Sequence, residues 1–439
     1  MYAPKFKKQQ DARYLKAFGC DRNELIAHIP SFQEINFAVE SSFDSGKTAT
    51  GENIRRNPRN TPGVDIHTVA AESPFYRYLA YYGFKGLLQN NSTVNASGDS
   101  DEAPRLSAGF IEVENNVRRR SYKGAGALQV ANEPRKEAMR KLFILRLTHT
   151  KVKNGKRKLA IVSHGLFDHL GIYKHLIEVL YQLGFDVIAF DYRGFGLSEG
   201  EATHCQGFDD YVEDLTIVER EVAGQPIDLY AGQSTGCAII SLLLDKRVRE
   251  SPARKSRAKQ SLKAQADGSA HDGPTNEGQC EMRKPSLSNP KFLFFAPLAQ
   301  PRGFRSIRTS HYFLNRFIQW FPRTFRNNSS DLFFVAFLRD DDPLQSLALR
   351  VSWISSLIRW VTALKQLSPK DMKGLIVLGK QDRTIDLKSV RANYSRIYPY
   401  AEWLTIAGAG HQLVNESADK RNLVQERLIQ FLAIDEASR

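Results

Sequence analysis

The stretch at residues 226–244 constrains the fold of this chain more than any other. A short apolar run reaches Gly232, Ser234 follows, and a second apolar run with helical spacing begins at once. This order predicts a strand, a tight turn and a helix, with Ser234 at the apex of the turn. Gly232 and Gly236 flank the serine, and residues without side chains let a strand and a helix pack closely around a strained turn. Because Gly-x-Ser-x-Gly is short enough to arise by chance, its meaning depends on the rest of the chain.

The chain around this stretch alternates between two apolar patterns. Runs of about four to eight apolar residues are typical of buried strands, and apolar residues three and four positions apart are typical of one helix face. Helical spacing occurs at 172–183, 211–222 and 423–432, and strand-like runs occur at 110–117, 142–147, 159–163, 186–191, 227–231, 292–297, 375–378 and 403–406. Strands that alternate with helices of this length predict an α/β fold with a mostly parallel sheet flanked by helices. In such sheets the chemistry lies at the carboxyl ends of the strands.

Changes in composition divide the chain into six segments. An aromatic, amphipathic helix is expected at 73–88 in the first segment, and helices at 312–321 and 344–367 in the fifth. The third segment is rich in Lys, Arg, Ser, Ala and Gly, which predicts disorder. The segments are an N-terminal extension that is partly disordered (1–106), the first part of the α/β core (107–245), a basic low-complexity insertion (246–289), a core strand (290–301), a helical segment (302–370) and the second part of the core (371–439).

Cysteine usage and apolar patterning predict a cytoplasmic protein. The four cysteines are scattered without paired spacing, which argues against a disulfide scaffold and a zinc site. Residues 1–11 carry three lysines and lack the apolar centre of a signal peptide. No apolar run approaches the ~18 residues of a membrane span. We expect neither a metal nor an organic cofactor.

A serine nucleophile needs a base that takes its proton and an acid that orients the base. His411 follows the predicted strand that ends at Ile406, and Asp382 follows the strand that ends at Leu378. We therefore expect Ser234, Asp382 and His411 to meet at one edge of the sheet as nucleophile, acid and base. Their order along the chain, Ser, Asp, His, is the order found in α/β-hydrolases. Asp386, four residues further from the strand, is the alternative acid.

The negative charge that forms during attack on an ester needs two backbone N–H donors. The residue after the nucleophile, Thr235, supplies one, and the loop after the strand ending at Ser163 supplies the other, for which we choose Leu166. His164 in the same loop is interpreted as a buttress that holds the loop by hydrogen bonds, with a catalytic role as the alternative.

Four motifs carry a resemblance to a known family. In order along the chain they are His164-Gly-Leu-Phe-Asp-His169, Asp191-Tyr-Arg-Gly-Phe-Gly-Leu-Ser198, Asp210-Tyr-Val-Glu-Asp-Leu215 and Gly232-Gln-Ser-Thr-Gly236. With the later Asp and His, they resemble the monoglyceride lipase and lysophospholipase branch of the α/β-hydrolases, which is also described as serine aminopeptidase S33-like. The resemblance covers about residues 107–245 and 290–433.

The resemblance implies an α/β-hydrolase fold with a helical cap at 302–370, inserted after the sixth strand. It assigns Ser234, Asp382 and His411 to the triad, and the backbone N–H groups of Leu166 and Thr235 to the oxyanion. The sequence departs from the family in two ways. The residue before the nucleophile is usually His in this branch and is Gln233 here, and neither the N-terminal extension nor the 246–289 insertion has a counterpart in the family core.

The formal net charge of +14 is concentrated in two segments. The insertion holds ten basic against five acidic residues, and the cap holds eleven against four. Basic residues interleaved with Phe, Trp, Leu and Ile in the cap suit docking on an anionic membrane surface at the inner face of the membrane. The alternative is a cap whose apolar face lies on the core while its arginines are solvated. No nucleic-acid recognition motif occurs, so no nucleic-acid partner is expected.

Together these features predict a serine hydrolase that cleaves carboxylic esters of lipid-like alcohols. Monoacylglycerols or lysophospholipids are the expected substrates, because an apolar cap suits an acyl chain. Two alternatives stay open: a membrane-associated interaction protein that keeps the fold without catalysis, and a peptidase or thioesterase with the same triad. The sequence predicts no oligomeric state.

Overall fold

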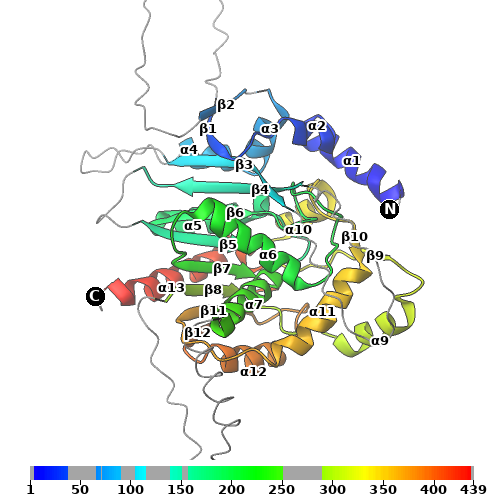
Figure 1. The fold of residues 1–439 in the computed structure, drawn as a ribbon, viewed down its shortest axis with the longest axis vertical. Coiled ribbons are helices and arrows are strands. Elements are labelled where there is room, and N and C mark those ends of the chain that lie inside the picture. Colours follow the sequence, from blue (N-terminus) through cyan, green and yellow to red (C-terminus); the bar gives the residue numbers. More distant parts are fainter. Residues whose placement is uncertain are drawn as a thin grey trace, which may run out of the picture.

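A ten-stranded sheet forms the centre of the molecule, in the order β12-β11-β8-β7-β5-β6-β4-β3-β1-β2 (Figure 1). The computed structural model describes residues 4–37, 66–70, 72–89, 104–114, 139–150, 157–250 and 289–436. The strands are β1 Gln33–Phe37, β2 Ile66–Val69, β3 Arg105–Glu114, β4 Met139–Thr148, β5 Lys158–Ser163, β6 Phe185–Phe190, β7 Leu229–Gln233, β8 Lys291–Phe295, β11 Gly374–Gly379 and β12 Ala401–Ile406.

The central strands are parallel and buried. β6, β5, β7, β8, β11 and β12 run in one direction, and β4 and β3 join them through antiparallel pairs. The apolar runs that identified β5, β6, β7, β8 and β11 lie almost wholly inside the core. Each strand predicted from the sequence overlaps one of these strands, so the mostly parallel sheet is confirmed.

Helices flank the sheet as the periodicity predicted. α6 continues into a π-helical turn, η4, and packs against α7. α5 and α13 both approach the short turn η6, which follows β12. The helices of the core are η3 Leu170–Tyr173, α5 Lys174–Gln182, α6 Phe208–Val218, η4 Glu219–Ala223, α7 Thr235–Glu250, α12 Leu387–Ile397, η6 Leu413–Asn415 and α13 Ala418–Glu436.

The described part of the N-terminal extension is folded onto the core, which the sequence did not reveal. β1 pairs antiparallel with β3 and parallel with β2, so two strands of the extension lengthen the sheet. The helix expected at 73–88 is two helices, α3 Pro74–Tyr81 and α4 Phe84–Gln89, separated at Gly83, whose φ is 76°. Residues 38–65 and 90–103 lie outside the described residues.

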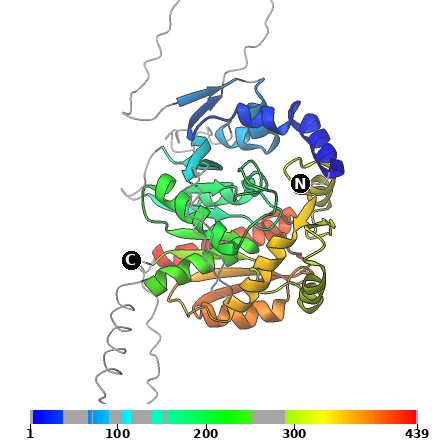
Figure 2. The same cartoon turned by 45° about the vertical axis from the view of Figure 1, so that its right-hand side comes forward.

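Two helices that precede β1 were not predicted. They are α1 Pro4–Phe18 and α2 Arg22–Ala27. α1 reaches across the molecule to the segment around residue 340, and the blue helix lies beside the yellow segment in both views (Figures 1 and 2).

The start predicted for the insertion before β8 needs correction. The insertion does not begin at residue 246, because α7 continues to Glu250, with Arg247 bound to the Tyr230 hydroxyl and to Glu219. Residues 251–288 lie outside the described residues.

In the 302–370 segment, the helices predicted at 312–321 and 344–367 are displaced. Residues 320–322 and 348–350 instead form a two-stranded antiparallel ribbon, and the helices end or begin beside it. The elements of this segment are α9 Phe304–Leu314, β9 Trp320–Pro322, α10 Leu332–Ala336, η5 Phe337–Asp341, β10 Ala348–Arg350 and α11 Val351–Leu364.

Candidate active site

Ser234 occupies the turn between β7 and α7 in a strained conformation. Its φ is 51°, in the left-handed region that residues with a Cβ rarely adopt. The Ser234 N–H donates to the Phe295 carbonyl at 2.9 Å, and its carbonyl accepts from Leu298 N–H at 3.1 Å, so the last residue of β8 and the loop after it hold the two ends of Ser234. A Cβ at Gly236 would overlap the Ser163 carbonyl oxygen, which is why helix and strand need glycine here.

Asp382 and His411 form a buried pair at the ends of β11 and β12. His411 Nδ1 donates to Asp382 Oδ2 at 2.7 Å. Asp382 Oδ1 accepts from the N–H groups of Thr384 at 2.7 Å and Ile385 at 3.2 Å. Burial raises the pKa of Asp382, but His411 and these N–H donors outweigh it, so that pKa lies below its usual value. Burial lowers the pKa of His411, but the Asp382 charge outweighs it and the pKa is raised.

The serine turn and the histidine loop are joined directly by Gln233. Its side-chain Nε2 donates to the His411 carbonyl at 2.7 Å, although Gln233 is fully buried and its Oε1 has no hydrogen-bond partner among the described residues. From the other side, the Asn328 carbonyl of the 302–370 segment accepts from the N–H groups of His411 at 2.7 Å and Gln412 at 2.8 Å. The backbone around the base is therefore fixed from two directions.

The expected oxyanion donors lie on either side of the serine. Thr235 is the first residue of α7, where backbone N–H groups have no partner within the helix. Leu166 lies in the loop after β5, next to Gly165, at which a Cβ would stand 3.5 Å from Ser234 Cβ. Within the described residues neither N–H donates to a protein acceptor. Both groups are available to an oxyanion beside Ser234.

Asp168 joins the loop after β5 (residues 164–169), called the oxyanion loop below, to the segment that carries His411. Its Oδ1 accepts from Gln412 Nε2 at 2.8 Å, and its Oδ2 accepts from the Tyr173 hydroxyl at 2.9 Å. Burial raises the pKa of Asp168 in spite of these two donors. The negative charge it carries when ionised also raises the pKa of His411.

The contacts of His164 and Asp386 hold the backbone around them and do not involve Ser234 or His411. His164 Nδ1 lies 2.8 Å from the Gly165 carbonyl, and its Nε2 accepts from Tyr192 N–H at 3.1 Å, as expected of a buttress. Burial lowers the pKa of His164 to about 3, so the ring is neutral. Asp386 caps α12 and accepts from Gln300 Nε2 at 3.0 Å, whereas Asp382 contacts His411.

Ser234, Asp382 and His411 are all nearly buried, with 7%, 3% and 6% of their surface exposed. Among the described residues Ser234 Oγ makes no hydrogen bond to a protein group. Hydrogen bonds between a catalytic serine and its base commonly tighten only in the complex with substrate. The serine turn and the Asp382–His411 pair follow β7, β11 and β12, so they lie at the carboxyl edge of the sheet.

Parts of this chain are similar to known proteins. Residues 154–254 match the sequence model of serine aminopeptidase S33. Monoglyceride lipase of Rattus norvegicus is 37% identical over 93 residues, and that of Homo sapiens is 36% identical over 93; each match covers 20% of this chain and 30% of the relative. A soluble variant of monoglyceride lipase from Saccharomyces cerevisiae, solved with a substrate analogue, is 16% identical, with 72% of this chain and 97% of that chain covered and a TM-score of 0.49.

The family match includes the strained serine between β7 and α7 and the loop after β5. The chain has the α/β-hydrolase fold. The matched part of this chain spans less than a third of the length of the two mammalian relatives. The family match ends before Asp382 and His411, so the assignment of acid and base depends on the geometry described above.

Sequence reasoning missed several residues that organise this candidate site. Gln233 was noted only as a departure from the family, and nothing in the sequence marked Asn328 or Gln412. Their contacts join segments that are remote along the chain, and local patterns cannot show these. The described residues include no cluster of three or more His, Cys, Asp or Glu side chains suited to a metal ion. None of the helices in this part of the chain is long and apolar enough to cross a bilayer.

Proposed function

We propose that this α/β-hydrolase cleaves carboxylic esters of lipid-like alcohols, with monoacylglycerols or lysophospholipids as substrates. The observation that carries the proposal is the strained Ser234 beside the Asp382–His411 pair, with Gln233 joining the two loops. The likeness to monoglyceride lipases supports lipid esters as the substrate class.

The geometry supports a two-step mechanism. His411 Nε2 takes the proton of Ser234 as Oγ attacks the acyl carbonyl, and the oxyanion forms at the N–H groups of Leu166 and Thr235. His411 returns the proton to the leaving alcohol oxygen, which leaves an acyl-enzyme on Ser234. A water molecule, deprotonated by His411, then attacks the acyl carbonyl. Ser234 regains its proton and the fatty acid is released.

A substrate panel tests this proposal. Purified protein and a Ser234→Ala variant are compared on p-nitrophenyl esters, a monoacylglycerol, a lysophospholipid, an acyl thioester and an amino-acid anilide. We expect ester turnover that the variant loses, and covalent labelling of Ser234 by a fluorophosphonate. Turnover that survives in Ser234→Ala would refute the mechanism. A folded wild-type protein that neither hydrolyses these substrates nor takes the label would favour the interaction-protein alternative. Preferred cleavage of the thioester or the anilide would favour a thioesterase or a peptidase.

We further propose that the 302–370 segment docks this enzyme on an anionic membrane surface. Several large apolar side chains of this segment are exposed, with 83% of Phe317 and 91% of Phe333 accessible. Exposed arginines accompany them at positions 302, 305, 308, 316 and 326. Exposed aromatic rings can enter the interfacial region of a bilayer while neighbouring guanidinium groups meet lipid phosphates.

Sedimentation with vesicles tests the membrane contact. Binding to phosphatidylserine-containing vesicles should weaken as salt rises, because the phosphate contacts are screened. A Phe317→Glu, Phe333→Glu variant should lose binding, and Leu423→Glu, a half-exposed leucine on α13, is the matched control. Binding that does not depend on salt or lipid charge would contradict this role. Equal binding by the double variant and by Leu423→Glu would also contradict it.

A further inference from the structure

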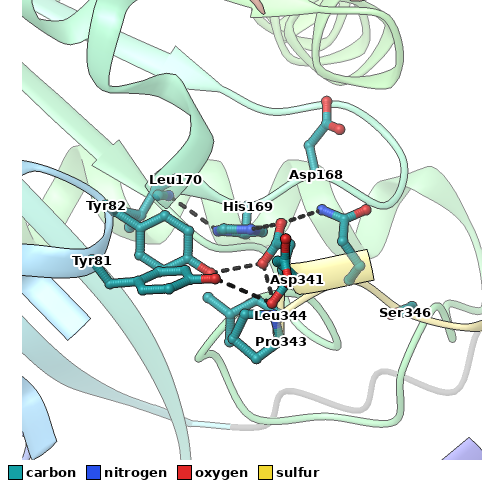
Figure 3. Close-up of polar contacts among 12 residues, drawn as sticks. Tyr81, Tyr82, Asp168, His169, Leu170, Asp341, Pro343, Leu344 and Ser346 are labelled. Carbon is teal, nitrogen blue, oxygen red and sulfur yellow. Dashed lines mark hydrogen bonds and ion pairs between the residues drawn. The ribbon is translucent and has the colours of Figure 1, made fainter. Parts of the chain in front are cut away.

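A buried cluster of polar side chains joins three segments that are remote in sequence (Figure 3). Asp342, which follows η5, accepts from His169 Nε2 at 2.9 Å and from the Tyr82 hydroxyl at 2.7 Å. It also accepts from Gln345 Nε2 at 2.9 Å and from Leu344 N–H at 3.1 Å. His169 belongs to the oxyanion loop and Tyr82 to the N-terminal extension. The cluster therefore connects the extension, the 302–370 segment and the loop beside the nucleophile.

The hydrogen bonds around Asp342 favour its ionised form. Burial would raise the pKa of Asp342, but His169 and the donors from Tyr82 and Gln345 outweigh it, and that pKa is lowered. His169 Nδ1 accepts from Gly171 N–H at 3.2 Å, which places the ring proton on Nε2, facing Asp342. Removal of any one donor would leave this buried carboxylate with an unsatisfied oxygen, so the four groups are held together.

The N-terminal extension fixes the backbone around Asp342 as well as its side chain. Arg13 Nη1 on α1 donates to the Asp342 carbonyl at 3.2 Å, and Gln10 Nε2 donates to the Pro343 carbonyl at 3.2 Å. The Tyr81 hydroxyl donates to the Asp341 carbonyl at 3.1 Å. Contacts from α1 and α3 thus hold the turn that carries Asp342.

The oxyanion loop is anchored at three successive residues. Phe167, with φ of 67°, stacks against the Arg323 guanidinium, whose carbon lies 4.1 Å from the ring centre. Asp168 is held by Gln412 and Tyr173, and His169 is held by Asp342. Arg323 also donates to Gln345, which in turn binds Asp342, so the first and third anchors are connected. Leu166, the expected oxyanion donor, immediately precedes these three residues.

We propose that the N-terminal extension is a positioning element for the oxyanion hole: Tyr82 and α1 fix Asp342, Asp342 holds His169, and His169 sets the position of the Leu166 N–H. The extension has no counterpart in the family core, and its effect reaches the site without touching substrate. This inference rests on the proposed esterase function, because an oxyanion hole matters only to acyl transfer.

Two tyrosines of the same helical region provide the test. Tyr82→Phe removes one donor to Asp342. Tyr78→Phe is the matched control, because the Tyr78 hydroxyl is equally buried and has no hydrogen-bond partner among the described residues. Loss of one hydrogen bond to a charged group corresponds to about a tenfold effect. We expect Tyr82→Phe to lower kcat for ester hydrolysis about tenfold with KM unchanged, and Tyr78→Phe to change neither.

A tetrahedral inhibitor separates positioning from general stability. A boronic acid that forms an adduct with Ser234 uses the oxyanion donors, whereas the fatty acid product needs them much less. Tyr82→Phe should weaken boronate binding about tenfold and leave fatty acid binding unchanged. A lowered melting temperature with unaltered kcat and boronate affinity would overturn the proposal. An increase in KM with kcat preserved would also overturn it.

A readout without substrate keeps this inference distinct from the proposed function. Hydrogen exchange of the backbone amides at 165–171, followed by mass spectrometry, should be faster in Tyr82→Phe than in Tyr78→Phe. If the wild-type protein takes no fluorophosphonate and hydrolyses no ester, the proposed function fails, and the exchange rates alone decide whether the extension holds this loop. Equal exchange in the two variants would refute the coupling itself.

Discussion

Replacing Asp382 by Asn tests the assignment of the acid in this site. The Asp382 side chain accepts from His411 on one oxygen and from two backbone N–H groups on the other. An Asn whose oxygen keeps the two backbone donors must turn its NH₂ toward His411 Nδ1. That donor drives the ring proton to Nε2, so His411 can no longer accept the proton of Ser234. We expect kcat to fall about 10⁴-fold, which is about 5.4 kcal/mol of barrier.

We also expect the pH dependence of kcat/KM to change in Asp382→Asn. His411 must be neutral to act as a base, so wild-type kcat/KM should rise with pH through a pKa above the ordinary value of about 6.5. In Asp382→Asn the charge that raises this pKa is gone and burial, which lowers it, remains. The rising limb of the residual activity should therefore move to lower pH. The assay is kcat/KM for a p-nitrophenyl ester between pH 4 and 9, at about unit intervals.

Asp386→Asn is the matched control for this change. Asp386 caps α12, and Asn is an equally good cap, so stability and activity should stay close to wild type. A loss of less than tenfold in Asp382→Asn, an unmoved rising limb, or a larger loss in Asp386→Asn would refute the assignment of the acid.

Two further changes test packing around the site. Gly236→Ala should destabilise the protein by about 1–3 kcal/mol in urea unfolding, since a Cβ there overlaps the Ser163 carbonyl, whereas Gly86→Ala, with no atom nearby, should not destabilise it. Asp214→Ala should lower the free energy of unfolding by about 3–5 kcal/mol, because Arg140 and Arg193 lose their buried carboxylate. Glu221→Ala, which breaks an exposed ion pair with Arg220, should change it by less than about 0.5 kcal/mol. Equal costs within either pair would contradict the reasoning.

The parallel strands and the positions of Ser234, Asp382 and His411 follow from local patterns. Buried strands of a parallel sheet are continuous apolar runs, and their carboxyl ends share one edge, so the residues after each run can be placed together without a structure. α1 carries no such signal, because its sequence is largely polar and the partners of Gln10 and Arg13 lie more than 300 positions away.

The role of Asp342 also could not be predicted from the sequence. It is the third of three consecutive aspartates, and the sequence treats them alike. Only the packing of Tyr82 and His169 distinguishes Asp342, which is fully buried, from Asp340, which is exposed, and Asp341, which is partly exposed. A contact formed between distant segments has no local pattern from which it could be predicted.

The contact between α1 and the turn after η5 bears on the order of events during synthesis. Gln10 and Pro343 are 333 residues apart, so a ribosome adding about 5–20 residues per second exposes α1 on the order of tens of seconds before its partner emerges. Contacts of such long range form late in folding. Maturation of the loop beside Ser234 then waits for synthesis of the segment around residue 340, and a nascent chain that stops short of residue 339 has the serine turn but lacks the groups that hold the neighbouring loop.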